Sequence, residues 1–324
     1  MSKRRITFAT LSLALASVFS ASAQARPSAE TAVLSTGSSL AVWQIDAETP
    51  TQSGTVIFLH GGPGLYTEER RFDEAAVFRK AGYATLFFDQ AGSGQSAKLN
   101  ASEYSLARSV ADLEALRIAR GLDTIILWGN SFGANLAVLY ARQYPDKVAA
   151  LILTAPGTFP GLVVKRDYSR TNRNGVDIGK DLAKAAGAID KEGSKAEGAF
   201  SQVDTGKLLD ALTDSELLDA MTCKSSVVTL PKLPGGGNLF VNRILQAELK
   251  KVKPDWATLP KVPSLIIRGD CDFLPAKSAI AYQDVLGAEY VAIPNAGHAL
   301  LEDRLTVDLA IESFIQRRLL AAKP

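Results

Sequence analysis

Residues 124 to 141 read TIILWGNSFGANLAVLYA. An apolar run reaches Gly-Asn-Ser-Phe-Gly at 129–133, and the chain then continues directly in a pattern that predicts a helix. Glycines two residues on either side of Ser131 let a strand and a helix meet in a sharp turn, which exposes the serine hydroxyl at the carboxyl end of a sheet. We therefore predict that Ser131 is a nucleophile, rather than a serine with only a structural role.

Short apolar runs recur along the chain and set the fold class. Their apolarity is continuous rather than alternating, which is typical of strands buried on both faces of a parallel sheet. Helical patterns separate them, as at 106–113 and 303–321, and 31–46 predicts two strands joined by a Thr-Gly-Ser-Ser turn. We predict an α/β fold, a doubly wound and mostly parallel sheet. The runs are residues 55–60, 84–90, 124–130, 148–156, 263–270 and 288–295.

One stretch interrupts this alternation. The chain has 324 residues, of which 47% are hydrophobic and 22% charged, and this composition suits a globular protein with a substantial core. Residues 157–260, however, hold polar helical patterns, a glycine-rich LPGGGN turn and few strand signals. We predict a mainly helical cap there, inserted before the penultimate strand, between core segments 26–156 and 261–324.

The first 25 residues have the layout of a secretory signal peptide. A basic start at 3–5 precedes an apolar stretch at 6–19 and the small-residue cleavage site Ala-Gln-Ala at 23–25. The apolar stretch is short for a membrane span, and an uncleaved N-terminal anchor is the alternative. Cleavage changes the formal net charge from +2 to −1 by removing three basic residues. We expect a secreted or periplasmic protein with no membrane association after cleavage and, without a basic stripe, no nucleic-acid partner.

A serine hydroxyl needs a base to remove its proton, and the chain has only two histidines, His60 and His298. His298 follows the last predicted strand and satisfies the chain order serine, acid, histidine that this type of turn implies. The acid, which accepts the other ring N–H of the base, should follow the penultimate strand, where IIRGDCDF offers Asp270 and Asp272. The Gly-x-x-Asp spacing favours Asp272, and Asp270 is then expected to shape the turn.

Residues 56–64, VIFLHGGPG, end a predicted strand in backbone with few side chains. Attack on a carbonyl group builds negative charge on its oxygen, which backbone N–H groups about 3 Å away can stabilise. We expect one donor to be the N–H of Phe132, directly after the nucleophile. The second donor is expected from Gly62, with Gly61 as the other candidate, because bare glycine lets an oxyanion approach closely.

The remaining residues of these loops are predicted to be structural. Pro63 stiffens the glycine loop, Gly64 lets the chain turn back, and the ring of His60 is expected to bond loop backbone. The stretch FFDQAGSGQS at 87–96 predicts a tight turn after the next strand, with Asp89 as part of its scaffold.

The two cysteines, Cys223 and Cys271, lie far apart in the sequence. Export would allow them to form a disulfide, while two buried free thiols are the alternative, and we expect the thiols. There is no CxxC motif and no zinc-type spacing, so we expect no metal site. Acyl transfer to water through a serine, a histidine and an acid requires no cofactor.

Four motifs together give a resemblance to known proteins. HGGPG, DQAGSGQS, GNSFGA and the GDCD…GH pair resemble the α/β-hydrolase superfamily and, within it, most closely the proline iminopeptidase family, over residues 31–156 and 260–321. The resemblance implies an α/β-hydrolase fold and removal of an N-terminal proline or a similar residue from peptides. It also implies that Ser131 is the nucleophile, Asp272 the acid, His298 the base and Gly62 an oxyanion donor.

The sequence departs from the family pattern in two motifs and in the cap. Ala91 stands where the turn usually has arginine, and Phe132 where the family commonly has tryptophan. Family peptidases hold the substrate ammonium group with acidic residues of the cap, and their usual motif is missing here. The acids available in the cap are Glu192, Glu197, Glu216 and Glu248.

Three functions are therefore compared. The first is an exported serine aminopeptidase that acts on a small-molecule or short-peptide substrate. The second is an esterase or lactonase with the same catalytic residues, and the third is a non-catalytic ligand-binding relative. The complete set of nucleophile, base, acid and glycine loop favours an enzyme, and the resemblance favours the aminopeptidase.

Overall fold

The computed structural model describes residues 27–52, 54–172, 218–228, 236–253 and 255–321. The predicted signal peptide lies outside the described residues. So do three of the four candidate cap acids, Glu192, Glu197 and Glu216.

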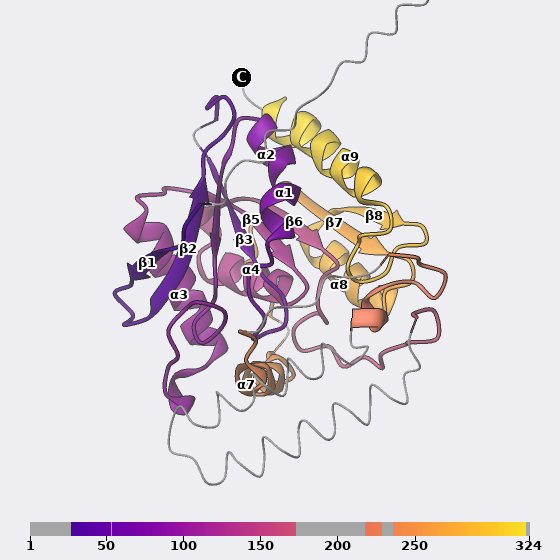
Figure 1. Cartoon of the computed structure of the whole chain (residues 1–324), viewed down its shortest axis with the longest axis horizontal. Helices are drawn as coiled ribbons and strands as arrows, with labels where there is room; N and C mark the ends of the chain where they lie inside the picture. The colour runs from indigo at the N-terminus through magenta and orange to yellow at the C-terminus, as the bar shows by residue number, and fades with distance from the viewer. Residues whose placement is uncertain (1–26, 53, 173–217, 229–235, 254, 322–324) are drawn as a thin grey trace, which may run out of the picture.

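An eight-stranded sheet forms the centre of the molecule (Figure 1). Its strand order is β1-β2-β4-β3-β5-β6-β7-β8; β1 and β4 both run antiparallel to β2, and all other neighbours are parallel. The predicted doubly wound, mostly parallel sheet is confirmed. The strands are β1 (Glu30–Val33), β2 (Ser39–Ile45), β3 (Thr55–Leu59), β4 (Ala84–Phe88), β5 (Ile125–Asn130), β6 (Val148–Thr154), β7 (Ser264–Gly269) and β8 (Glu289–Ile293).

Helices cover both faces of the sheet, which explains the continuous apolarity of its central strands. β3, β5 and β7 are buried along their whole length. One buried cluster joins the sheet to α3, α4 and α8, and a second joins its other face to α2 and α9. The helices are α1 (Arg70–Glu74), α2 (Ala76–Lys80), η1 (Ala101–Glu103), α3 (Leu106–Ala119), α4 (Phe132–Gln143), η2 (Pro145–Lys147), η4 (Leu218–Met221), α7 (Leu239–Leu249), α8 (Ala276–Leu286), α9 (Arg304–Phe314) and the π-helical η5 (Ile315–Leu320).

The predicted cap falls between β6 and β7, and the structure describes part of it. Residues 173–217, 229–235 and 254 of this stretch lie outside the described residues. The described part contains the helices η4 and α7. Helix α7 lies at the bottom of the view in Figure 1, and its buried residues Val241, Leu245 and Leu249 belong to the apolar cluster that contains α3 and α4.

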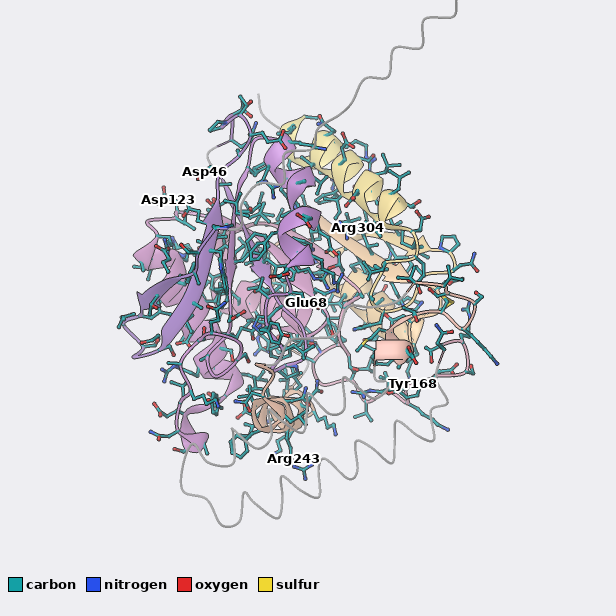
Figure 2. The ribbon with its side chains drawn as sticks, in the orientation of Figure 1. Asp46, Glu68, Asp123, Tyr168, Arg243 and Arg304 are labelled. Carbon is teal, nitrogen blue, oxygen red and sulfur yellow. A yellow bond between two sulfur atoms is a disulfide. The ribbon has the colours of Figure 1, made fainter. Side chains whose placement is uncertain are left out.

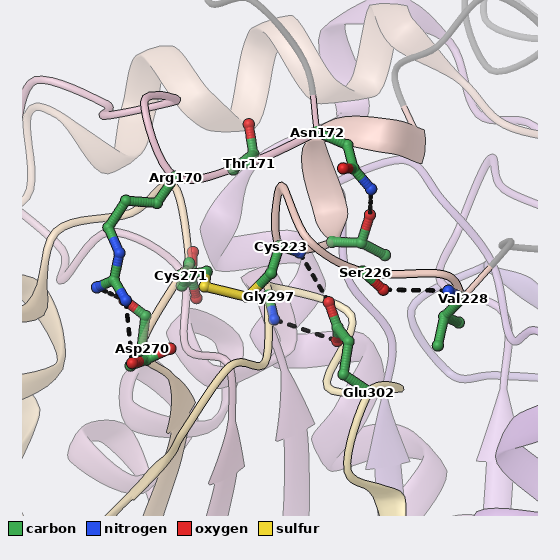
Figure 3. The surroundings of a disulfide bond; sticks show 12 residues. Arg170, Thr171, Asn172, Cys223, Ser226, Val228, Asp270, Cys271, Gly297 and Glu302 are labelled. Carbon is green, nitrogen blue, oxygen red and sulfur yellow. Dashed lines mark hydrogen bonds and ion pairs between the residues drawn. A yellow bond between two sulfur atoms is a disulfide. The ribbon is translucent and has the colours of Figure 1, made fainter.

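Cys223 and Cys271 are joined by a disulfide, with their Cα atoms 5.4 Å apart (Figure 3). The expectation of two free thiols was therefore wrong. A tertiary contact that the sequence does not reveal brings the two cysteines together. In this contact, the carboxylate of Glu302 accepts the N–H of Cys223 at 2.8 Å and the N–H of Gly297 at 3.2 Å. These hydrogen bonds place the segment after η4 against the loop that follows β8, and the disulfide joins it to the loop that follows β7.

Within the part of the chain that the structure describes, none of the helices combines the length and apolarity that a membrane crossing requires.

Candidate active site

Four loops meet at the carboxyl edge of the parallel strands. Gly62 follows β3, Ser131 follows β5, Asp272 follows β7 and His298 follows β8. The carboxyl ends of parallel strands lie at one edge of the sheet, so residues far apart in the chain come together there. All the residues that the sequence predicts for the site come from this edge.

The backbone at Ser131 adopts a conformation that side chains disfavour, with φ of 52°. The flanking glycines make this turn sterically feasible. A Cβ atom on Gly129 would lie 2.6 Å from the carbonyl oxygen of Gly133, and a Cβ on Gly133 would overlap the carbonyl oxygen of Leu59. The turn therefore needs glycine at both positions, and it presents the Ser131 hydroxyl just before α4 begins.

Ser131, His298 and Asp272 form one hydrogen-bonded chain. Nε2 of His298 lies 3.0 Å from Oγ of Ser131, and its Nδ1 lies 2.9 Å from Oδ2 of Asp272. The other carboxylate oxygen of Asp272 accepts the N–H of Leu274 at 2.8 Å. With Nδ1–H donated to the carboxylate, Nε2 is left to accept the serine proton, which is the arrangement that general-base activation of a hydroxyl requires.

The alternative acid, Asp270, faces a different group. Its carboxylate accepts a hydrogen bond from Nη2 of Arg170 at 3.0 Å (Figure 3). Arg170 belongs to the stretch that follows β6, so this ion pair joins that stretch to the loop of Asp272. The geometry leaves Asp270 outside the hydrogen-bonded chain.

Two backbone N–H groups next to Ser131 could stabilise an oxyanion. Phe132 is the first residue of α4, where the helix dipole is positive. Gly61 packs directly on the nucleophile, because a Cβ there would come within 3.0 Å of Cβ of Ser131. The N–H groups of Gly62 and Phe132 donate no hydrogen bond to another described residue, so both are available to a ligand.

His60 bonds the backbone on both of its ring nitrogens. Nε2 accepts the N–H of Gln90 at 2.8 Å, so Nδ1 carries the proton and donates to the carbonyl oxygen of Gly61 at 3.0 Å. That carbonyl shares a planar peptide unit with the N–H of Gly62, so the bond also fixes the direction of the oxyanion donor. Burial lowers the pKa of His60 to about 4, which keeps the ring neutral at neutral pH.

Asp89 stands in the turn after β4 and bonds its backbone. Its carboxylate accepts the N–H of Thr67 at 2.8 Å and that of Gln95 at 2.9 Å. Gly94 is required beside it, because a Cβ there would overlap the carboxylate. Burial raises the pKa of Asp89 to about 6, although the two N–H bonds oppose that shift. Its contacts are those of a scaffold residue.

The sequence did not lead us to expect that α7 forms hydrogen bonds to the HGGPG loop. The N–H of Asn238 donates to the carbonyl oxygen of Gly64 at 2.6 Å. One turn further on, Nδ2 of Asn242 donates to the carbonyl oxygen of Pro63 at 2.8 Å. Nε2 of Gln246 makes a longer contact of 3.5 Å with that of Gly62. The spacing of four residues between these amides is the one signal in the sequence that could have indicated a helix face with a shared role.

A buried ion network behind the nucleophile was also missed. Nη2 of Arg71 donates to Oδ1 of Asn130, the residue before Ser131, at 2.9 Å, and Nη1 donates to Glu74 at 2.7 Å. Burial alone would raise the pKa of Glu74, but the charges of Arg71, Arg70 and Arg304 outweigh it and lower the pKa to about 2. Glu74 is therefore ionised throughout the physiological range.

A cavity of about 200 Å³ opens beside Ser131 and His298. The carboxylate that lines it, in the described part of the chain, belongs to Glu68, near the centre of the molecule in Figure 2. Glu68 is bonded to Arg70, with Nε and Oε2 2.5 Å apart. Glu248, the described candidate among the cap acids, instead accepts the N–H of Leu106 at the start of α3 at 2.7 Å.

One group among the described residues has the composition of a metal site, formed by Cys223, Asp270 and Cys271. The two sulfur atoms are bonded to each other, so neither is a thiolate that could bind a metal. The expectation that the reaction needs no metal stays a prediction.

Comparison with known proteins assigns the family. A model of the α/β-hydrolase fold family matches residues 54–305, and the chain belongs to that family. A probable proline iminopeptidase of Leptolyngbya boryana is 24% identical over 286 residues, which covers 76% of this chain and 82% of that protein. The proline iminopeptidase of Xylella fastidiosa (strain 9a5c) is 36% identical over 101 residues, 30% of this chain and 31% of that protein. The chain is thus a hydrolase that is similar to proline iminopeptidases.

Solved structures share the fold at low sequence identity. The esterase EaEST from Exiguobacterium antarcticum superposes with a TM-score of 0.60 at 17% identity, covering 88% of this chain and 98% of that chain. A bromoperoxidase from Bacillus anthracis gives a TM-score of 0.61 at 19% identity, with 90% and 99% covered. These likenesses establish the fold.

Proposed function

We propose that the protein is an exported serine hydrolase that transfers an acyl group to water, and that it acts as an aminopeptidase of the proline iminopeptidase type. The observation that carries the proposal is the hydrogen-bonded chain from Asp272 through His298 to Ser131, next to the free N–H groups of Gly62 and Phe132. The similarity to proline iminopeptidases supports the choice of substrate class.

The reaction proceeds in two halves. Nε2 of His298 takes the proton of Ser131 as Oγ attacks the scissile carbonyl carbon, and Asp272 stabilises the imidazolium. The oxyanion accepts hydrogen bonds from the two N–H groups. Nε2 then gives its proton to the leaving amine as the carbon–nitrogen bond breaks. Water, deprotonated by the same nitrogen, then attacks the acyl carbon, and Nε2 returns the proton to Oγ of Ser131 as the bond from that carbon to Oγ breaks.

An aminopeptidase must also receive the ammonium group of its substrate, because a desolvated charge without a partner is costly. Glu68 is the candidate receptor among the described residues, since it lines the cavity next to Ser131. The charges of Arg71 and Arg70 lower the pKa of Glu68 against the opposing effect of burial, so it is ionised at neutral pH.

A carboxylesterase or lactonase is the second candidate, favoured by one specific observation. Both oxygens of Glu68 already contact Arg70, at 2.5 and 3.3 Å, so an ammonium group would have to compete with a guanidinium. A neutral ester requires no acidic receptor. The same nucleophile, base, acid and oxyanion donors would hydrolyse it.

One experiment separates these candidates. Glu68→Gln and the control Asp73→Asn, an exposed acid of α1, are assayed with an alanyl or prolyl arylamide and with a short neutral ester. An aminopeptidase should lose about 2 kcal/mol of transition-state stabilisation in Glu68→Gln with the arylamide, and little with the ester. Good ester turnover without arylamide cleavage in the unchanged enzyme would contradict the peptidase and leave the hydrolase.

Export is proposed from the basic and apolar start of the chain. The disulfide supports it, because such bonds persist in oxidising compartments. Protein purified from an exporting cell should begin at Arg26, or at Gln24 if the preceding Ala-Ser-Ala is cleaved. An intact mass that includes Met1 would contradict the proposal.

A further inference from the structure

Residues 166–168 run beside the candidate nucleophile and base, and contacts to the residue after Asp272 fix their position. The N–H of Asp167 donates to the carbonyl oxygen of Phe273 at 2.8 Å, and the ring of Tyr168 stacks on that of Phe273 at 5.3 Å with an angle of 13°. The Phe273 ring in turn packs on the ring of His298 at 4.7 Å. These contacts fix the position of the segment relative to the candidate base, His298. Figure 2 labels Tyr168 beside η4.

Arg166 extends from this segment to the wall of the cavity at Ser131. Its guanidinium carbon lies 5.6 Å from the centre of the Phe273 ring, and Nη1 donates to the hydroxyl of Tyr168 at 3.4 Å. Among the residues that the structure describes, it forms no ion pair with a carboxylate. The carboxylate of its neighbour Asp167 does not line the cavity and accepts the N–H of Ser169 at 3.0 Å.

The other charges around this cavity balance one another. Arg70 is paired with Glu68 and Glu74, and Arg71 with Glu74. Arg166 is thus the cation that has no acidic partner among the described residues lining the cavity. A cation held in place and left unpaired favours an anionic group on the ligand.

The cavity at Ser131 adjoins a second cavity of about 390 Å³, and Arg166 and Tyr168 line both. The second cavity has apolar walls, such as Phe159 and Leu162, and a further cation, Lys250. A substrate whose scissile carbonyl lies at Ser131 would place its more distant end at Arg166, where the two cavities meet.

We infer that Arg166 binds a carboxylate of the substrate, and that the enzyme prefers short acyl compounds with a free carboxylate. The inference rests on the proposed function: for an aminopeptidase, it identifies a dipeptide whose C-terminal carboxylate meets the guanidinium. A guanidinium presents parallel N–H donors that match the two oxygens of a carboxylate, and its stacking on an aromatic ring reduces the freedom lost on binding.

The test compares prolyl-alanine with prolyl-alanine amide, which differ in the C-terminal charge. In Arg166→Gln, KM for the dipeptide should rise about tenfold with kcat little changed, because a charge-assisted hydrogen bond is lost at an exposed site. KM for the amide should stay within about twofold. In the unchanged enzyme, added salt should raise KM for the dipeptide alone, since salt screens exposed charges.

Lys165→Gln is the matched control, because it removes the same charge from the next residue, which is exposed and does not line the cavity. Equal effects of the two variants, or equal effects of Arg166→Gln on both substrates, would overturn the inference.

If the enzyme cleaves neither peptide, the aminopeptidase proposal fails separately. The same variants are then compared on 4-acetoxybenzoate and phenyl acetate, two esters that differ in a carboxylate on the leaving group, and a preference for the charged ester that Arg166→Gln removes would still support the carboxylate site.

Discussion

At the scale of single residues, two carboxylates of one loop occupy different environments. Asp272 bonds the ring of His298, whereas Asp270 pairs with Arg170. We predict that Asp272→Asn lowers kcat by about 10³- to 10⁴-fold, because the base loses its orienting acceptor. Asp270→Asn should change kcat less than about tenfold, since its partner lies outside the hydrogen-bonded chain. Steady-state kinetics of the two variants decide between them, and a larger loss in Asp270→Asn would show that the wrong acid was chosen.

His60 should make the stability of the protein fall in acid. Its pKa in the folded state is lowered from 6.5 to about 4 by burial, so below pH 6.5 the unfolded chain takes up a proton that the folded chain excludes. Stability contributed by the neutral ring is present above pH 6.5 and is lost as the pH falls towards 4. Between pH 7 and 4.5 the loss should be about 2 to 3 kcal/mol in the free energy of unfolding.

The buried carboxyl of Asp89 works in the opposite direction over the same range. Its pKa is raised to about 6, so the folded state gains stability as Asp89 takes up its proton. The measurement is therefore a difference between the unchanged protein and His60→Gln, each unfolded in urea at pH 7 and 4.5. Equal losses in both proteins would show that His60 is not the group responsible.

At the scale of elements, α7 contacts the loop that carries the oxyanion donor. Asn242→Ala removes the hydrogen bond to the carbonyl oxygen of Pro63, one residue from Gly62. We expect kcat to fall about fivefold, which corresponds to about 1 kcal/mol for one hydrogen bond, with little change in KM.

Two further variants test this role of α7. Asn242→Asp keeps the size of the side chain but removes the donor, and it should be at least as impaired as the alanine variant. Ala247→Asn adds an amide on the exposed face of the same helix and should leave kcat unchanged. Full activity in both Asn242 variants would show that α7 does not position the loop.

The elements of the fold could be predicted because their signal is local. Continuous apolar runs marked the strands, and the glycines around Ser131 marked a turn that the structure shows to be sterically crowded. The order of residues along the chain was enough to choose His298 over His60 as the candidate base. Their catalytic roles stay predictions until they are measured.

The contacts that could not be predicted join residues far apart in the sequence. Arg71 meets Asn130 across 59 positions, Asn242 meets Pro63 across 179, and Cys223 meets Glu302 across 79. Such pairs depend on how finished elements pack. Neither the periodicity of apolar residues nor the spacing of motifs contains information about that packing. For this reason the disulfide between Cys223 and Cys271 was not expected.

At the scale of the whole molecule, the disulfide joins the segment after η4 to the loop of Asp272. It spans 48 positions of the chain, so it restricts the unfolded state considerably. We predict that replacing both cysteines by alanine lowers the free energy of unfolding by about 2 to 4 kcal/mol, measured by urea denaturation. In the unreduced native protein no thiol should react with an alkylating reagent. Alkylation of both cysteines before reduction would contradict the bond.

The central claim is that Ser131 is the nucleophile of an acyl-transfer enzyme, and covalent labelling tests it most directly. A fluorophosphonate reacts with a serine whose hydroxyl is activated by a base. We predict one adduct per chain by intact mass, located on Ser131 by peptide mapping, and no adduct in Ser131→Ala. Labelling of His298→Ala should be slower by several orders of magnitude. An adduct on another residue, or an unlabelled protein that still hydrolyses its substrate, would contradict the account.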